Sequence, residues 1–142
     1  MTDKVEFASA AWIDALEHAM RTRAEAAAPE DLAVYAMSET YTNAPAHLAP
    51  DGTIGFHVRF GPEGFEFHRQ PSRYVDFGVI GEYEAVQEIA RVIVDGDDEK
   101  QLAMDRIAGR AIKAGKLEVF GDRTNLPGVL DGVHDEVARI TA

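Results

Sequence analysis

The stretch Ile54-Gly-Phe-His-Val-Arg-Phe60 alternates strictly, with apolar residues at positions 54, 56, 58 and 60 and glycine or polar residues between them. A period of two is typical of a β-strand with one buried and one solvated face. The turn Gly61-Pro-Glu-Gly64 follows it, and Phe65 and Phe67 then continue the apolar set. The two segments therefore predict a β-hairpin.

The apolar face of these strands collects most of the aromatic rings. Five of the seven phenylalanines belong to it, namely Phe56, Phe60, Phe65, Phe67 and Phe77. The last of them lies in a further expected strand near Tyr74–Ile80. Something apolar must cover these rings, either the chain's own helices, a ligand, or both. As single residues they are read most simply as core, and the alternative is that some of them line a cavity.

Helical periodicity appears on both sides of the strands. Apolar residues at i, i+3, i+4 and i+7 predict helices after Ser9, through 86–93 and through 104–112, the last of these stopped by Gly115. A final helix is expected to open at Pro127 and to bury Leu130, Val133, Val137 and Ile140.

Two more strands are expected, over Leu32–Ser38 and Lys116–Gly121, and the polar loop Glu39–Thr53 between strands is a candidate lid. The order of elements is helix, three or four strands, two helices, strand, helix. It indicates an α+β fold with helices on a mostly antiparallel sheet. We expect residues 1–142 to form a single domain.

Composition excludes several classes of function. The net charge of -11 disfavours binding to nucleic acid or to anionic membranes. The absence of cysteine excludes disulfides and thiolate chemistry and suits a reducing cytoplasm. No apolar run has the length of a membrane span. Because nucleotide-binding, phosphate-cradling and zinc-protease motifs are also absent, we expect no cofactor and no metal.

The polar face of the hairpin is a candidate for chemistry. If Phe60 lies opposite Phe65, then Arg59 opposes Glu66 and His57 opposes His68. Two facing imidazoles beside a carboxylate could hold a metal or act as acid and base. The simpler interpretation is a solvated face with one cross-strand ion pair.

Other titratable residues give weaker signals. Asp131, His134 and Asp135 stand at i, i+3 and i+4 and could share one side of the last helix. Arg69, Arg73 and Arg110 are the basic residues to consider for a phosphate or an acyl carboxylate, and they are scattered along the chain.

The part of the chain from Tyr74 to Asp122 resembles the sterol carrier protein 2 (SCP2) family. The likeness lies in Val75-Asp-Phe-Gly-Val-Ile-Gly-Glu-Tyr-Glu-Ala-Val86, in Ala111-Ile-Lys-Ala-Gly-Lys-Leu-Glu-Val-Phe-Gly-Asp122 and in the hairpin that precedes them. The resemblance implies a five-stranded sheet with helices packed on one face, enclosing an apolar tunnel for sterols, fatty acyl chains or their coenzyme A esters. It implies no catalytic residues. The acidic insert Asp95–Lys100 and the lack of a peroxisomal address depart from the family pattern.

We therefore expect a protein that binds and carries a hydrophobic small molecule. The residues expected to line the tunnel are Trp12, Phe56, Val58, Phe77, Ile89, Ile107 and Leu117. Two alternatives remain. One is an enzyme that uses the same cavity, with His57, His68 or Tyr74 as the acid–base group. The other is a protein-interaction module with a vestigial cavity. The sequence leaves the oligomeric state open.

Overall fold

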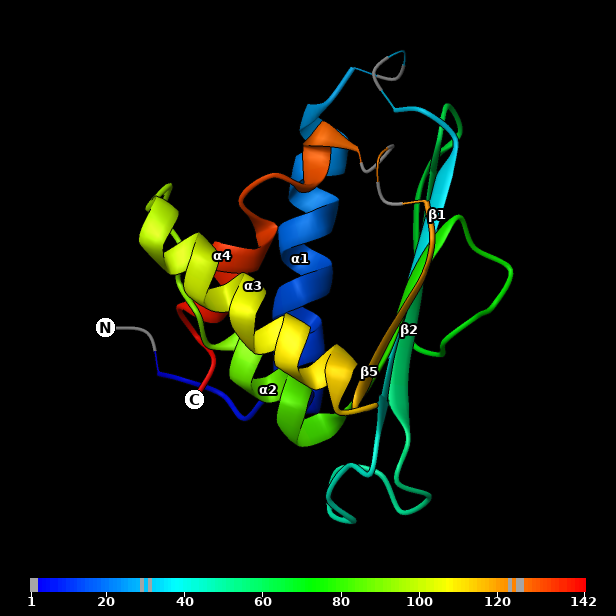
Figure 1. Ribbon diagram of the computed structural model, residues 1–142. Helices are drawn as coiled ribbons and strands as arrows, with labels where there is room; N and C mark the ends of the chain where they lie inside the picture. Colours follow the sequence, from blue (N-terminus) through cyan, green and yellow to red (C-terminus); the bar gives the residue numbers. More distant parts are fainter. Residues whose placement is uncertain (1–2, 29, 31, 123, 125–126) are drawn as a thin grey trace.

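The helices lie on one face of a five-stranded sheet in the computed structural model, which describes residues 3–28, 30, 32–122, 124 and 127–142 (Figure 1). The strand order is β3-β2-β1-β4-β5, where β1 and β4 run parallel and the other neighbours run antiparallel. The strands are β1 Tyr35–Thr42, β2 Ile54–Gly61, β3 Gly64–His68, β4 Phe77–Glu82 and β5 Leu117–Gly121. The predicted fold class, an α+β fold with a mostly antiparallel sheet, is confirmed.

The hairpin of β2 and β3 has the predicted register. Phe60 pairs with Phe65, Arg59 pairs with Glu66, and His57 pairs with His68. The alternation and the turn at 61–64 together predict this pairing, because a slip of one residue would turn every phenylalanine to the other face and the turn length excludes larger slips.

The predicted bounds of two other strands were wrong. The first strand was expected over 32–38, whereas β1 begins at Tyr35 and continues to Thr42. Its helix-facing side includes Glu39, which breaks the apolar pattern. The strand near 74–80 begins only at Phe77, and Tyr74 is 90% exposed.

The segment 69–76, between β3 and β4, crosses the face of the sheet opposite the helices (Figure 1). His57 Nδ1 donates a hydrogen bond to the carbonyl of Gln70, and the amide of Ser72 donates to Ser38 Oγ. At its end, the Asp76 carboxylate accepts a hydrogen bond from the amide of Ala36. His57 and Ser38 are consequently buried, so the expectation of a solvated face is wrong where this segment lies.

The helices are α1 Ala10–Ala26, α2 Tyr83–Ala90, α3 Asp98–Lys113, the 3₁₀ turn η2 Gly128–Leu130 and α4 Val133–Ala138. Ser9 caps α1 as predicted, since its side chain accepts a hydrogen bond from the amide of Trp12. The predicted last helix is instead divided into η2 and α4, because Gly132 between them has a φ of 85°. In the part of the chain described, no helix is long and apolar enough to cross a membrane.

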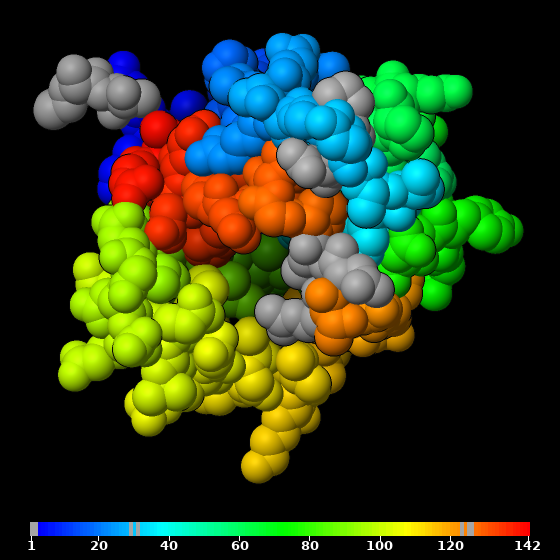
Figure 2. Space-filling model, turned by 90° about the horizontal axis from the view of Figure 1, so that it is seen from above, coloured from blue at the N-terminus to red at the C-terminus, as the bar shows by residue number. Residues whose placement is uncertain are grey.

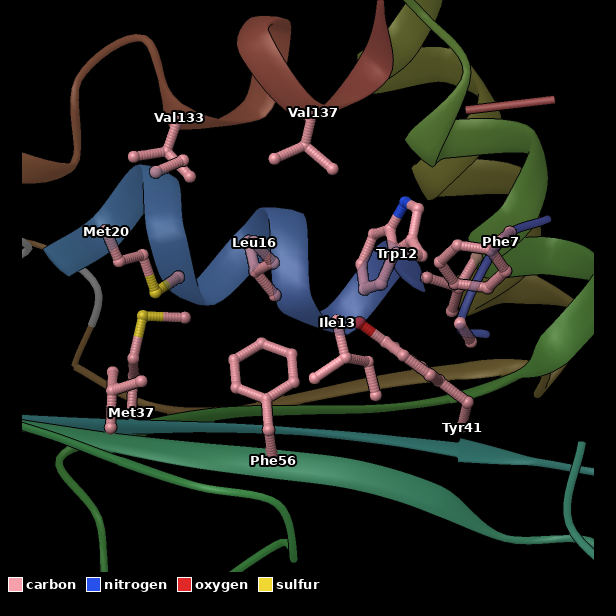
Figure 3. Close-up of a cluster of buried hydrophobic side chains, with 14 of the residues drawn as sticks. Phe7, Trp12, Ile13, Leu16, Met20, Met37, Tyr41, Phe56, Val133 and Val137 are labelled. Carbon is pink, nitrogen blue, oxygen red and sulfur yellow. The ribbon is translucent and has the colours of Figure 1, made fainter. Parts of the chain in front are cut away.

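The phenylalanines of the hairpin pack beneath α1. The rings of Phe56 and Phe67 stack with centroids 5.3 Å apart, and the guanidinium of Arg21 from α1 lies 5.0 Å from the centroid of Phe65. Figure 3 shows Met37 and Phe56 of the sheet facing Met20 and Leu16 of α1. Helix α1 thus covers Phe56 and the β2–β3 side of the sheet.

Candidate functional site

A cavity of about 390 Å³ lies between the other half of the sheet and the helices. Seen from above, the molecule is hollowed between α3, in yellow, and the C-terminal segments, in orange and red, with green residues at the base of the hollow (Figure 2). Most of the wall is apolar. The lining residues are Phe7, Trp12, Leu16, Met20, Met37, Glu39, Tyr41, Phe77, Val79, Val86, Ile89, Ala90, Gln101, Met104, Asp105, Ala108, Leu117, Val119, Leu130, Val133, His134 and Val137.

The position of the cavity follows from side-chain size. The helix-facing positions of β2 and β3 carry large rings, whereas those of β4 and β5 include Val79 and Val119. Opposite them, α2 and α3 present Ala90 and Ala108. Small side chains on both walls leave a volume that the helices do not fill, although protein interiors are normally packed without such voids.

Helix α3 forms one wall of the cavity and is largely exposed on its other side. Of its residues, all of them described, only Ala111 is buried. The chain on either side of α3 has left-handed backbone, with φ of 48° at Asp95, 72° at Gly96 and 74° at Gly115.

The structure places the seven predicted lining residues in three groups. Trp12, Phe77, Ile89 and Leu117 line the cavity. Phe56 and Val58 are fully buried in the core beneath α1, and Ile107 lines a separate pocket on the α2–α3 side. As ligand contacts, all seven remain predictions.

The predicted lid over 39–53 has different bounds from those expected, because its first four residues belong to β1. The rest of that loop is a compact turn. In it the Leu48 and Ala49 amides donate to the carbonyl of Pro45, and the Ala44 amide donates to the carbonyl of Gly52. The two residues of the stretch that line the cavity, Glu39 and Tyr41, do so from the strand.

Glu39 and Tyr41 are polar residues of the cavity wall that sequence reasoning missed, and His134, which it grouped with Asp131 and Asp135, also lines the cavity. The hydroxyl of Tyr41 donates a hydrogen bond of 2.8 Å to Glu39 Oε1. Burial raises the pKa of Glu39, and the bond from Tyr41 and the charge of His134 oppose that rise. Burial and the neighbouring Glu39 also raise the pKa of Tyr41 well above 10.0. Alternation through positions 35, 37, 39 and 41 would have placed Glu39 inside if the strand had been predicted at its full length.

The Asp131, His134 and Asp135 cluster is not assembled as a site. The left-handed Gly132 leaves Asp131 outside α4. The Asp135 carboxylate accepts hydrogen bonds from the amides of Val94 and Asp95, each 2.9 Å long, and His134 Nε2 donates to the carbonyl of Val92. Asp135 and His134 thus fasten α4 to the connection between α2 and α3.

We expect Asp135→Asn to lower the free energy of unfolding by about 1 kcal/mol at pH 7, because it weakens two charge-assisted hydrogen bonds. The backbone hydrogen bonds hold the pKa of Asp135 below 3.8. A carboxyl with a lowered pKa stabilises the folded state above its unfolded pKa and loses that contribution as pH falls through its folded pKa. Urea denaturation should therefore show the difference at pH 7 and little of it near pH 2.

The matched control is Asp131→Asn, since Asp131 contacts Arg23 through its backbone carbonyl. This control should stay within about 0.5 kcal/mol of the natural sequence. An equal loss in both variants would contradict the prediction.

The imidazoles of the hairpin lie on the face away from the cavity. His57 and His68 stack with ring centroids 4.6 Å apart, and His68 is within 3.4 Å of Glu66. Among the described residues no group of three or more histidines and carboxylates could hold a metal. The third candidate for acid–base chemistry, Tyr74, lies on the crossing segment.

The predicted basic residues are also away from the cavity. Arg69 pairs with Asp14 and Glu17 of α1, and Arg110 lines the same separate pocket as Ile107. Arg73 is exposed on the crossing segment. The described wall of the cavity contains no arginine or lysine.

Solved structures of sterol carrier proteins are similar to this chain. The crystal structure of sterol carrier protein 2 is 10% identical, covers 95% of this chain and 96% of that one, and has a TM-score of 0.48. The chain also resembles a conserved hypothetical protein from Thermus thermophilus (11% identical, 99% and 92% covered, TM-score 0.44). Palmitated SCP2L2 from Aedes aegypti is 17% identical, with 78% and 83% covered and a TM-score of 0.41.

These likenesses concern the fold alone. No protein-family model and no curated protein matches the chain. The cavity, rather than this likeness, supports the function proposed below.

Proposed function

We propose that the protein binds and carries an apolar small molecule, such as a sterol or a molecule with a fatty alkyl chain, in the cavity between the sheet and α3. The observation that supports this proposal is the mostly apolar cavity of about 390 Å³, which opens to the surface of the molecule. Ligand pockets typically measure about 300–1,000 Å³. A vestigial cavity would be expected to have collapsed, because unfilled apolar volume destabilises a core.

Partition from water supplies the binding energy. Each square ångström of apolar surface removed from water contributes about 25 cal/mol, so a ligand that buries about 200 Å² gains about 5 kcal/mol. The four cavity-lining residues predicted from sequence, Trp12, Phe77, Ile89 and Leu117, are proposed as contacts. The enzyme alternative receives no support from His57, His68 or Tyr74, since none of them is on the described cavity wall.

Trp12 allows a direct test. It is the single tryptophan of the chain and it lines the cavity. Its indole nitrogen donates a hydrogen bond of 3.0 Å to Thr141 Oγ1, so the polar atom of the ring is already paired and the ring carbons are free to contact an apolar ligand. We expect 1-bromodecane, whose bromine quenches tryptophan only on contact, to quench Trp12 fluorescence in a saturable way. Native mass spectrometry should show one molecule bound.

The control moves the reporter to the other side of the sheet. In a Trp12→Phe, Tyr74→Trp variant the tryptophan stands at a position that is 90% exposed on the crossing segment, and we expect no saturable quenching there. Two results together would overturn the proposal: no quenching of Trp12, and no thermal shift of the protein with decane, 1-decanol or a sterol.

A further inference from the structure

A carboxylate lies on the floor of the apolar cavity. Glu39 is on the central strand β1, with Phe56 as its cross-strand partner on one side and Val79 on the other. Its side chain points to the helix-facing side, where it lines the cavity. A carboxylate among apolar neighbours is costly unless its oxygens are hydrogen-bonded. The hydroxyl of Tyr41 donates one such hydrogen bond, to Glu39 Oε1.

The second oxygen of Glu39 is open to the cavity. Among the described residues Tyr41 alone donates to this carboxylate, and it bonds Oε1. Yet no buried side-chain oxygen or nitrogen in the described chain lacks a partner. Oε2 therefore keeps accessible surface, and the surface in front of it is the cavity. It can accept a hydrogen bond from a bound molecule.

The charges around the cavity favour one class of head group. Glu39 on the floor and Asp105 on α3 are acidic, and His134 on α4 is the one basic group of the described wall. His134 is already bonded to the carbonyl of Val92. A carboxylate or phosphate head would meet two acids without an arginine or lysine to pair with, and the chain as a whole carries a charge of -11.

We propose that the ligand carries a hydrogen-bond-donating head, a hydroxyl or an amine on an apolar body, which binds Glu39 Oε2, and that anionic heads are rejected. This inference rests on the proposed function and narrows it. Glu39 acts as the polar anchor that orients the ligand, while the apolar wall supplies most of the affinity. Ligand sites commonly combine an apolar lining with a few such placed polar groups.

The test compares four ten-carbon probes that differ only in the head. Decane, 1-decanol, decylamine and decanoate each compete with 1-bromodecane for the site beside Trp12. We expect 1-decanol or decylamine to bind about tenfold more tightly than decane, since one hydrogen bond to a charged acceptor is worth roughly that factor. Decanoate should bind at least tenfold more weakly than either of these donors.

Two variants test whether Glu39 causes the preference for hydrogen-bond-donating heads. Glu39→Leu removes the acceptor and should abolish the advantage of the donors over decane. Glu39→Gln keeps the shape and an acceptor oxygen but lacks the charge, so the penalty on decanoate should shrink. Equal affinities for all four heads, or a donor preference that survives Glu39→Leu, would overturn the inference. Failure of 1-bromodecane and decane to bind at all would instead overturn the proposed function.

The stability of the protein as a function of pH tests whether the Glu39 carboxylate serves ligand binding or stabilises the fold. Burial raises the pKa of Glu39 above 4.5, and the titratable groups that line the cavity with it are Tyr41 on its own strand, His134 on α4 and Asp105 on α3. A carboxyl with a raised pKa contributes full stability below its unfolded pKa and loses it as pH rises through the folded pKa. Glu39→Gln should therefore be more stable than the natural sequence at pH 7 and equal to it below pH 4.5. A Glu39→Gln variant that is less stable at pH 7 would show that the carboxylate serves the fold rather than the ligand.

Discussion

Filling the cavity from both walls, by Val79→Phe on β4 together with Ala108→Phe on α3, should lower the affinity for 1-bromodecane by at least tenfold. Both positions line the cavity, and two rings in place of a valine and an alanine occupy much of its volume of about 390 Å³. The free energy of unfolding should not fall, because filling a void usually stabilises a core by about 0.5–2 kcal/mol. Trp12 quenching measures the affinity, and urea denaturation measures the stability.

The control introduces the same two phenylalanines on the outside of the same elements. Ile80 follows Val79 on β4 and points to the opposite face of the sheet, and Ile112 is a half-exposed residue of α3. Ile80→Phe with Ile112→Phe should leave the affinity within about twofold. Retained binding in the cavity-filling variant would place the ligand elsewhere on the molecule.

Gly121→Ala should cost about 3 kcal/mol of stability, the largest effect that we expect from adding a single methyl group. Gly121 ends β5 with a φ of 85°, and a Cβ at this position would lie 2.1 Å from the backbone carbonyl oxygen of Asp76. The clash is with backbone, which cannot rotate away as a side chain can. It adds to the strain of a left-handed alanine, and each of these is worth about 1–3 kcal/mol.

Gly115→Ala isolates the contribution of the backbone angle. Gly115 has a φ of 74°, and a Cβ there meets nothing within 4 Å. It should cost about 1 kcal/mol. Urea denaturation of both variants gives the comparison, and equal losses would show that the contact with Asp76 relaxes at no cost.

Strong local patterns made part of the fold predictable. The alternation of 54–60 and the short turn after it predicted the register of the hairpin, and Ser9 predicted the start of α1, because each of these depends on neighbouring residues. Gly132 shows the limit of such patterns. The apolar spacing of the last segment is helical throughout, and the break comes from a φ of 85° that the spacing does not encode.

The cavity could be predicted only in part. The sequence shows which residues are apolar. It does not show a void, because a void is the difference between the volume that the elements enclose and the volume that side chains fill. Phe56 and Phe77 have the same chemistry and lie on the same face of the sheet. Only Phe77 lines the cavity, because α1 covers Phe56 while α3 stands away from β4. Glu39 was missed for another reason, since a charged residue ended the predicted strand that in fact continues through it.

The segment that crosses beneath the sheet also bears on the order in which the protein folds. Strands β1, β2 and β3 follow one another in the chain and pair as neighbours, whereas β4 reaches β1 only after the chain has passed across the far face. Closing a long loop before its contacts form is slow, so the β1–β4 pair and β5 behind it belong to the late steps. A methyl group at Gly121, where β5 meets Asp76, should then mainly accelerate unfolding and leave the refolding rate nearly unchanged. In unfolding the order is reversed, so we expect β4 and β5, which carry part of the cavity wall, to separate from the rest of the sheet first.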